Sequence, residues 1–235
     1  MIGDTSTAMV LAAGRGERMR PLTDHTPKSL LKVGEQTLME HHLGKLARAG
    51  FRRVVINHAH LGDQIVSAVG DGRRWNIAVA FSAESQALET AGGIANALEL
   101  IDARTFAVVN ADIFSEYDYA SLKDAAKQLL QDRRRNAHLV LVDNPPHNRN
   151  GDFALQDGSV LIDSGLRLTF GGLAAYHSEM FMSLPAGTRT PLAPMLREQI
   201  QAGRVSGEHY SGYWVDVGTP QRLALVNEHL GGGKA

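Results

Sequence analysis

The stretch LAAGRGERMRPLTDHTPKSLLKVG, residues 11–34, carries the strongest signals for the fold and the chemistry of this chain. It continues an apolar run, residues 8–13, that is short enough to be a buried first strand. A turn at residues 14–16 follows, where glycines let the backbone approach a ligand closely and successive amide groups can form an anion nest. Residues 15–28 of the stretch carry four cations, Arg15, Arg18, Arg20 and Lys28. Together these features favour a polyphosphate site over a surface loop of solvated charges.

Composition limits the protein class. The chain has 235 residues and a formal net charge of -1, so we expect one domain over residues 1–235 and no nucleic-acid or membrane partner. It contains no cysteine, which excludes disulfides and thiolate metal sites and fits a cytoplasmic location. No apolar run approaches the roughly 20 residues that cross a bilayer.

Strand and helix patterns alternate through the first half. We expect strands at residues 53–57, 77–82 and 106–110, and helices at 36–49, 62–69 and 92–100. This alternation predicts a Rossmann-like α/β fold with a doubly wound parallel sheet. Ligands in such sheets bind beyond the carboxyl ends of the strands, where Gly14 and Asp112 both fall.

In the second half strands and helices no longer alternate regularly, but no linker divides the chain. Helices are expected at residues 119–131, 191–202 and 219–230, and strands at 137–142, 168–176 and 212–217. Residues 144–151 form a loop by composition, and Asp157 with Gly158 predicts a hairpin between residues 153–155 and 159–161. Gly171 and Gly172 interrupt a strand, which indicates a bulge or a close backbone approach to a ligand.

Two aspartates fall at the carboxyl ends of expected strands. Asp112 follows the strand at 106–110, and Asp216 lies within the strand at 212–217. Either alone fits a strand-end residue that caps a turn. Two carboxylates beside a polyphosphate loop fit Mg²⁺ better, because this ion takes one or two carboxylates plus phosphate oxygens.

The motifs together resemble the signature of the sugar-phosphate nucleotidylyltransferases. That signature, LAAGxGxRMxPLT followed by PKxL, stands here at residues 11–23 and 27–30. The family motifs NGD and WxDxGT stand at 110–112 and 214–219, with Ala111 in place of a glycine. The resemblance covers nearly the whole chain. It implies a GT-A type fold, a mixed, mostly parallel sheet flanked by helices as a three-layer sandwich, with Mg²⁺ held by Asp112 and Asp216.

The resemblance also implies a reaction. A sugar-1-phosphate oxygen attacks the α-phosphorus of a nucleoside triphosphate and releases pyrophosphate. Because the attacking oxygen is already anionic, catalysis reduces to aligning two repelling anions and neutralising the developing charge. By the resemblance, Arg15 contacts the β- and γ-phosphates and Lys28 bridges the α-phosphate and the incoming phosphate. The implied catalytic residues are Arg15, Lys28, Asp112 and Asp216.

The nucleotide is expected in a first half of about residues 8–115. The segment AESQALETAGG, residues 83–93, resembles the E…LGTAG segment that closes over base and ribose, with Glu89 in place of a glycine. Glu84 is a candidate acceptor for the N3–H of uracil or thymine, and a guanine N1–H suits it as well; a solvated loop carboxylate fits it equally. The expected nucleotide contacts are Ala12, Ala13, Gly14, Arg15, Gly16, Glu17, Arg18, Lys28, Glu84, Thr90, Gly92 and Asn110.

The sugar phosphate is expected in a second half of about residues 116–230. Family members with longer middle sections hold it with a lysine in an E-K-P type motif, but this chain has no lysine between Lys127 and Lys234. Arg149, Arg167 or the metal must then take that role. Candidate sugar contacts are Asp152, Gly172, Glu208 and His209, of which the last two fit an ordinary strand-edge pair equally well.

Two strings narrow the resemblance. VDNPPHNRNGDF at residues 142–153 and SGEHYSGYWVDVGT at 206–219 look most like the small uridylyltransferases that act on N-acetylmuramate α-1-phosphate in cell-wall sugar recycling. We therefore expect UTP and this sugar phosphate as substrates. Mannose-1-phosphate with GTP, glucose-1-phosphate with dTTP and phosphocholine with CTP stay open. A non-catalytic nucleotide-sugar sensor is the rival from another class, and the oligomeric state is left open.

Overall fold

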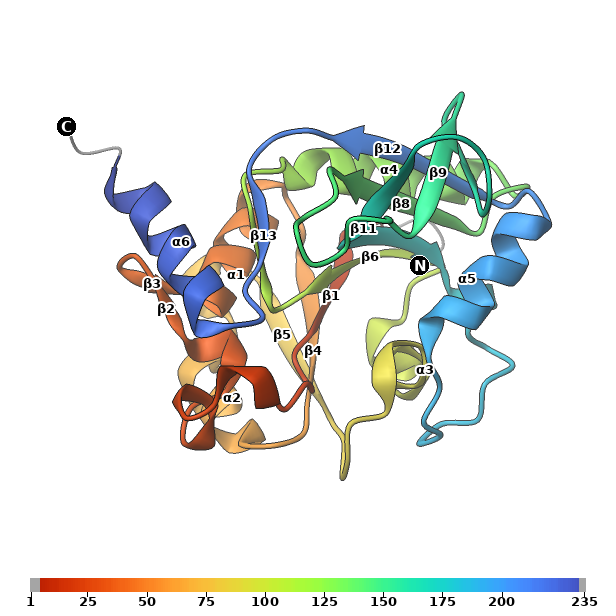
Figure 1. The fold of residues 1–235 in the computed structure, drawn as a ribbon. Coiled ribbons are helices and arrows are strands. Elements are labelled where there is room, and N and C mark those ends of the chain that lie inside the picture. The colour runs from red at the N-terminus through yellow and green to blue at the C-terminus, as the bar shows by residue number, and fades with distance from the viewer. Residues whose placement is uncertain (1–4, 233–235) are drawn as a thin grey trace.

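A nine-stranded mixed sheet forms the centre of the structure, a computed structural model that describes residues 5–232 (Figure 1). Residues 1–4 and 233–235 of the expected domain lie outside this described part. The strands of the sheet are β1 (Thr7–Leu11), β4 (Arg53–His58), β5 (Ala78–Ala83), β6 (Thr105–Asn110), β8 (Ala137–Val142), β9 (Phe153–Gln156), β10 (Ser159–Leu161), β11 (Arg167–His177) and β12 (Val205–Tyr210). Their order is β5-β4-β1-β6-β11-β8-β12-β10-β9.

The two halves of the chain contribute different pairings to this sheet. In the first half β1 pairs in parallel with β4 and β6, and β4 pairs in parallel with β5. In the second half β11 runs antiparallel to β6, β8 and β9, and β10 runs antiparallel to β9 and β12, while β12 is parallel to β8. The expected mixed α/β sheet is confirmed, and its parallel pairings lie mainly in the first half.

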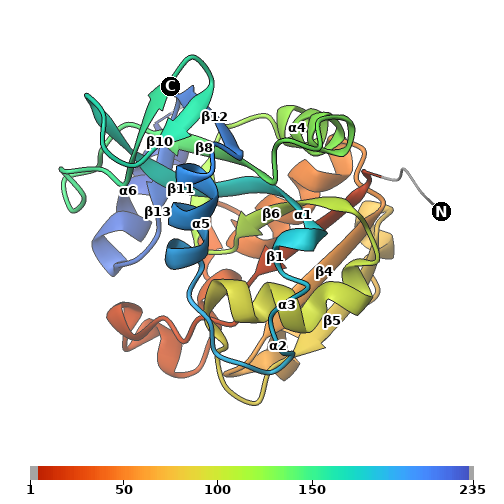
Figure 2. The ribbon, with the colours of Figure 1, turned by 90° about the vertical axis from the view of Figure 1, so that its right-hand side faces the viewer.

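Helices cover both faces of the sheet as three layers. The helices are α1 (Leu38–Arg48), α2 (Gly62–Val69), α3 (Glu89–Ile101), α4 (Tyr119–Gln131), α5 (Leu192–Gln201) and α6 (Pro220–Gly231). Successive strand residues point to opposite faces: Met9 joins the core beneath α3 and α5, whereas Ala8 and Val10 join the core beneath α1, α2 and α4. Figure 2 shows α3 and α5 in front of the sheet. No helix in the described range is long and apolar enough to cross a membrane.

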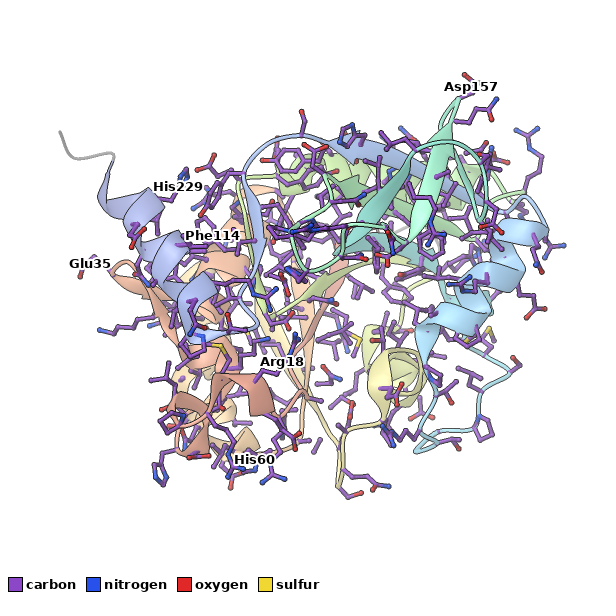
Figure 3. The ribbon with its side chains drawn as sticks, in the orientation of Figure 1. Arg18, Glu35, His60, Phe114, Asp157 and His229 are labelled. Atoms are coloured by element: carbon purple, nitrogen blue, oxygen red, sulfur yellow. The ribbon has the colours of Figure 1, made fainter. Side chains whose placement is uncertain are left out.

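Two short ribbons and α6 lie beside the main sheet. One ribbon pairs β2 (Lys32–Val33) with β3 (Gln36–Thr37), and the other pairs β7 (Ile113–Ser115) with β13 (Trp214–Asp216). Phe114, Val217 and Val226 belong to a separate apolar cluster that joins α6 to these ribbons. Figure 3 labels Phe114 and His229 on this side of the molecule. The packing anchors β13, which carries Asp216.

Most expected elements are present, with small shifts that have local causes. The first helix begins at Leu38 and not at residue 36, because Thr37 caps it: Thr37 Oγ1 accepts from the Glu40 amide at 3.2 Å. Asp157 lies at the tip of the expected hairpin (Figure 3). Asp157 and Gly158 in this turn have φ values of 49° and 72°. Strands β2, β3, β7 and β12 were not predicted, because they are short or alternate polar and small residues.

A buried histidine makes stability depend on pH. His42 on α1 is 2% exposed, its Nδ1 lies 2.8 Å from the Tyr119 hydroxyl, and burial lowers its pKa from 6.5 to about 4. The unfolded chain binds this proton more tightly, so the contribution is full above pH 6.5 and is lost as the pH falls towards 4. We expect the free energy of unfolding to fall by about 3 kcal/mol across this window. Urea denaturation from pH 7 to pH 4 measures this fall in the free energy of unfolding. If a His42→Gln variant shows the same dependence of that free energy on pH, the assignment to His42 is wrong.

Candidate active site

A pocket of about 670 Å³ opens at the carboxyl ends of β1 and β6. The expected residues that line it are Ala12, Ala13, Gly14, Arg15, Gly16, Glu17, Arg18, Lys28, Thr90, Asn110 and Asp112. It is also lined by Leu11, Ser29, Asn57, Ala87, Glu89, Ala111 and Gly218, which were not expected as contacts. The pocket lies at the edge where open α/β sheets bind ligands.

The loop after β1 folds back on itself to form one wall. Gly16 has a φ of 70°, and a Cβ there would lie 3.1 Å from Thr23 and 3.2 Å from Lys28, so only glycine fits this approach. The Gly16 carbonyl accepts from the Thr23 hydroxyl at 2.8 Å. A Cβ on Gly14 would meet nothing within 4 Å, which leaves the backbone open to the pocket. Arg18 projects from this loop (Figure 3).

Lys28 and Asp112 form the innermost ion pair of the site. Lys28 Nζ lies 2.6 Å from Asp112 Oδ2, and the lysine side chain is only 10% exposed. Asp112 follows β6, and the Ala111 amide donates to the Leu11 carbonyl at 3.0 Å, which ties the end of β6 to the end of β1. The ammonium group is therefore fixed at the pocket before any ligand binds.

Asp216, in the C-terminal part of the sequence, is held next to the segment that follows β6. Strand β13 pairs antiparallel with β7, which sets Asp216 opposite Ile113, and the Val217 amide donates to the Asp112 carbonyl at 2.7 Å. Asp216 Oδ1 lies 2.6 Å from Arg222 Nη1 and 3.0 Å from His147 Nε2. Asp216 is not on the pocket lining, but Gly218, two residues on, is.

The two carboxylates suit a hard cation. Asp112 Oδ1 and Asp216 Oδ2 have no hydrogen-bond partner within residues 5–232. The described residues contain no group of three or more His, Cys, Asp or Glu that would cage a metal. Mg²⁺ needs no such cage, because it takes one or two carboxylates and completes its shell with phosphate oxygens and water. The donor set therefore fits the expected ion.

Glu84, expected at the base, lies behind the pocket wall and is 7% exposed. Its Oε1 accepts from Asn57 Nδ2 at 2.7 Å, and its Oε2 accepts from the Leu88 amide at 2.9 Å. Asn57 lines the pocket and accepts from the Ala12 amide at 2.8 Å. A Cβ on Gly93 would lie 2.9 Å from Glu84 Oε1, so α3 closes over the pair. In this structure the Glu84 carboxylate positions Asn57 behind the pocket wall, and its expected contact with the base stays a prediction.

The Glu84→Ala variant tests this role. It leaves two buried donors unpaired, so we expect the free energy of unfolding to fall by about 1–3 kcal/mol. Ser85→Ala alters the exposed neighbour and is the matched control, expected to change stability by under about 0.5 kcal/mol. Urea denaturation compares the two, and equal stabilities would show that the Glu84 carboxylate holds nothing.

The start of α3 also differs from expectation. The helix begins at Glu89 and not at Gly92. Gly92 is absent from the pocket lining, and its amide donates to the Thr190 carbonyl at 3.0 Å, so it serves helix packing. Thr90 and Glu89 do line the pocket. Glu89 has a φ of 59°, in the left-handed region that favours glycine, and its carboxylate pairs with Arg189 at 2.7 Å.

Two expected sugar contacts support other residues. Asp152 Oδ1 accepts from Asn148 Nδ2 at 3.1 Å, and Oδ2 accepts from the Phe170 amide at 2.8 Å, so this carboxylate braces its own loop. Gly172, with a φ of 71°, lies at a bulge in β11, where a Cβ would come within 2.7 Å of Asn110 Nδ2. Neither is on the pocket lining. Gly172 makes room for the side chain of Asn110, and Asn110 does line the pocket.

Glu208 and His209 lie on β12, away from the pocket lining. Glu208 accepts from Tyr117 Oη and lies 3.4 Å from His138 Nε2, and the hydrogen bond from His138 lowers the pKa of its carboxyl group. His209 is exposed and lies 2.8 Å from Asp143. Strand β10 pairs with β12 only at Ser206, so Glu208 and His209 lie beyond that pairing and are paired with β8 alone.

Neither arginine expected to replace the missing lysine lines the pocket. Arg149 is exposed, and its Nε donates to the Pro146 carbonyl at 3.3 Å. Arg167 Nη2 donates to the Gly151 carbonyl at 2.9 Å, and Nη1 lies 3.8 Å from Asp163. Both arginines bond within the second-half loops, although the buried Nε of Arg167 has no hydrogen-bond partner among residues 5–232.

Sequence relatives match this chain along its whole length. It is 50% identical to the N-acetylmuramate alpha-1-phosphate uridylyltransferase of Neisseria meningitidis serogroup B, over 97% of this chain and 99% of that protein. It is 33% identical to the protein of the same name from Caulobacter vibrioides, over 95% and 96% of the two chains.

A solved structure shares the fold. HddC from Yersinia pseudotuberculosis, complexed with GMP-PN, superposes with a TM-score of 0.77 at 21% identity, over 95% of this chain and 99% of that chain. The sequence profile described as nucleotidyl transferase matches residues 7–162, which include β1, its basic loop and Asp112. With the pocket built on those same residues and relatives that match end to end, the chain belongs to the nucleotidyl transferase family.

Proposed function

We propose that this protein transfers UMP from UTP to N-acetylmuramate α-1-phosphate, giving a UDP-sugar and pyrophosphate. The observation that carries the proposal is the 50% identity with the Neisseria meningitidis protein over 97% of the chain. A triphosphate donor suits a pocket lined by Arg15, Arg18 and Lys28. The reaction serves cell-wall sugar recycling in the cytoplasm, where UTP is available.

The proposed catalytic cations differ in how firmly they are held. Arg15, with a side chain 58% exposed and only Glu17 nearby at 4.0 Å, contacts the β- and γ-phosphates and the departing pyrophosphate. Lys28, fixed by Asp112, contacts the α-phosphate. Charges placed before the reaction stabilise the transition state well, because they need no rearrangement as charge develops.

Asp112 and Asp216 hold the proposed Mg²⁺ through their unengaged oxygens. When bound, the ion supplies charge neutralisation and alignment of phosphate oxygens. The chain keeps the two aspartates together through the bond from the Val217 amide to the Asp112 carbonyl, at 2.7 Å. It also keeps a cation on each carboxylate, so the pair of negative charges is tolerated before the metal arrives.

The remaining contacts divide between the two halves. The nucleotide is held by the loop after β1 and by neighbouring strand and helix ends, with proposed contacts at Ala12, Ala13, Gly14, Gly16, Glu17, Arg18, Thr90 and Asn110. Asn57 is added to this set, since it lines the pocket and is braced by Glu84. The acceptor enters from the half that begins near residue 116, which brings Asp216 and Gly218 to the site.

A substrate matrix tests the proposal. Pyrophosphate release is measured with Mg²⁺ for UTP, CTP, GTP and dTTP, each against N-acetylmuramate α-1-phosphate, mannose-1-phosphate, glucose-1-phosphate and phosphocholine. We expect the highest kcat/KM for UTP with N-acetylmuramate α-1-phosphate. A preference for GTP with mannose-1-phosphate would overturn the substrate assignment. If no pair of substrates releases pyrophosphate, the non-catalytic nucleotide-sugar sensor becomes the favoured function.

A further inference from the structure

One cation at the pocket edge was not indicated by any motif. Arg222 lies in the first turn of α6, and its side chain is 14% exposed. Its Nη1 lies 2.6 Å from Asp216 Oδ1. Its Nη2 lies against Gly218, where a Cβ would come within 2.2 Å, and Gly218 lines the pocket. The second half of the chain thus brings a guanidinium group to the site.

Arg222 retains unused hydrogen-bond donors. Its side-chain contacts all use Nη1, which meets Asp216 Oδ1 and the ring nitrogens of His147 at 2.8 and 3.0 Å. Within residues 5–232 the buried Nε has no partner, and no described residue bonds Nη2. An unpaired buried donor costs about 1–3 kcal/mol. A ligand oxygen would complete the arrangement.

The charges at the site alternate in a way that suits two phosphates. Lys28 neutralises Asp112 and belongs to the basic loop of the nucleotide-binding half. Arg222 neutralises Asp216 and belongs to the second half. The backbone bond from the Val217 amide to the Asp112 carbonyl, at 2.7 Å, ties the segments that carry the two aspartates, and each carboxylate has a cation from a different half of the chain. A guanidinium group binds phosphate through paired N–H donors, a geometry that a lysine cannot supply.

The loop at residues 144–151 holds Arg222 in position. By the family resemblance, residues 143–153 correspond to the region in which longer family members carry the lysine of an E-K-P type motif, and this region has no lysine. His147 lies 3.0 Å from Asp216 Oδ1 and also contacts Arg222 Nη1. Arg149 of the same loop instead donates to Pro146. The loop therefore contributes a positioning residue, and α6 contributes the cation.

We infer that Arg222 binds the phosphate group of the acceptor and takes the role of the missing lysine. The inference rests on the proposed function for the identity of that acceptor, a sugar-1-phosphate. Lys28 then serves the donor phosphate and Arg222 the acceptor phosphate. His147 is a positioning residue that fixes the guanidinium group between Asp216 and the pocket edge.

Kinetics of Arg222→Gln and Arg222→Lys test this assignment. We expect Arg222→Gln to raise the KM for the sugar phosphate about 10- to 100-fold, the loss of hydrogen bonds to a charged group, with the KM for UTP nearly unchanged. Arg222→Lys should have a smaller rise in this KM, since lysine keeps the positive charge but lacks the paired N–H donors of the guanidinium group. Arg134→Gln is the matched control, because it breaks an exposed pair with Asp132 at 2.9 Å, near the opposite end of β8 from His147.

Binding measurements separate the acceptor from the metal, because losing Arg222 also frees Asp216. Calorimetry follows N-acetylmuramate α-1-phosphate binding to protein loaded with Mg²⁺ and a non-hydrolysable UTP analogue. We expect Arg222→Gln to weaken this binding by the same factor as KM. Mn²⁺ affinity, followed by electron paramagnetic resonance, is expected to change far less. If Arg222→Gln does not fold, Arg222→Lys decides by the same comparison.

An unchanged KM for the sugar phosphate in Arg222→Gln, or equal rises for both substrates, would overturn the inference. A larger rise in the KM for the sugar phosphate in Arg167→Gln than in Arg222→Gln would also overturn it. If the wild type turns over no acceptor, the proposed function fails separately. Titration of inorganic phosphate into protein loaded with Mg²⁺ and the UTP analogue then tests whether Arg222 binds phosphate. Weaker phosphate binding by Arg222→Gln than by wild type and Arg134→Gln supports the site. Equal binding, or none in all three, overturns it.

Discussion

The Asp112→Asn substitution is expected to lower turnover about 10³-fold while the protein stays folded. The Asp112 carbonyl accepts from the Val217 amide at 2.7 Å, and the Asp112 carboxylate holds Lys28 Nζ at 2.6 Å. The substitution removes one negative charge, so it weakens both the proposed Mg²⁺ site and the placement of the lysine. A metal ion contributes several kcal/mol of charge stabilisation, which corresponds to this loss of rate. The Asp112 side chain is 42% exposed, so the change opens no cavity in the core.

The measurement pairs kcat, from pyrophosphate release, with thermal unfolding of the same samples. Asp124→Asn changes an exposed aspartate on α4 and is the matched control, expected to keep wild-type turnover. If Asp112→Asn also keeps near-normal turnover, Asp112 is not a metal ligand. If it unfolds the protein, the carboxylate has a structural role that its exposure does not indicate.

The Arg15→Ala substitution is expected to lower kcat about 10²- to 10³-fold. Arg15 lines the pocket and is 58% exposed, so little of the fold depends on it. The negative charge on the leaving pyrophosphate grows during the reaction. An interaction that strengthens towards the transition state appears in kcat more than in KM. We therefore expect a much smaller change in the KM for UTP.

Steady-state kinetics with varied UTP separate the two parameters. Arg73→Ala removes another exposed arginine, one that pairs with Asp71 at 2.9 Å, and should leave both parameters unchanged. A rise confined to the KM for UTP would mean that Arg15 binds ground state and transition state equally. Its proposed role at the leaving group would then be wrong.

The loop after β1 could be predicted because its signals are local. Gly16 needs its positive φ within the loop itself, and the cations follow within a few residues. Even so, the 2.6 Å pair between Lys28 and Asp112 joins residues 84 positions apart. This ion pair was not predicted; the sequence indicated only that Gly14 and Asp112 lie at the same edge, because the carboxyl ends of parallel strands meet there.

Other site residues could not be placed from the sequence. Glu84 follows a strand, as a ligand-binding acid would, but its environment is set by Asn57 on the neighbouring strand β4 and by the close approach of α3. The signal for Asn57 was present: it is a polar residue at the end of a buried strand, at the same edge as Asp112. Arg222 left no signal, because its contacts with Asp216 and His147 depend on how α6 packs.

The second half of the sheet was harder to predict than the first. In the first half, buried apolar strands alternate with helices and imply parallel pairing. Strand β12 alternates small and polar residues, and its partners β8 and β10 lie well before it in the chain. The bulge at Gly171 and Gly172 was foreseen from the glycines, but its role, the close approach to Asn110, needed the pairing of β11 with β6.

Competition between substrates tests the central claim most directly. UTP, CTP, GTP and dTTP are supplied at equal concentration together with N-acetylmuramate α-1-phosphate, mannose-1-phosphate, glucose-1-phosphate and phosphocholine, and the products formed with Mg²⁺ are identified by mass spectrometry. UDP-N-acetylmuramate as the main product, with one pyrophosphate released per molecule, is the result we predict. GDP-mannose, dTDP-glucose or CDP-choline as the main product, or no product at all, would contradict it.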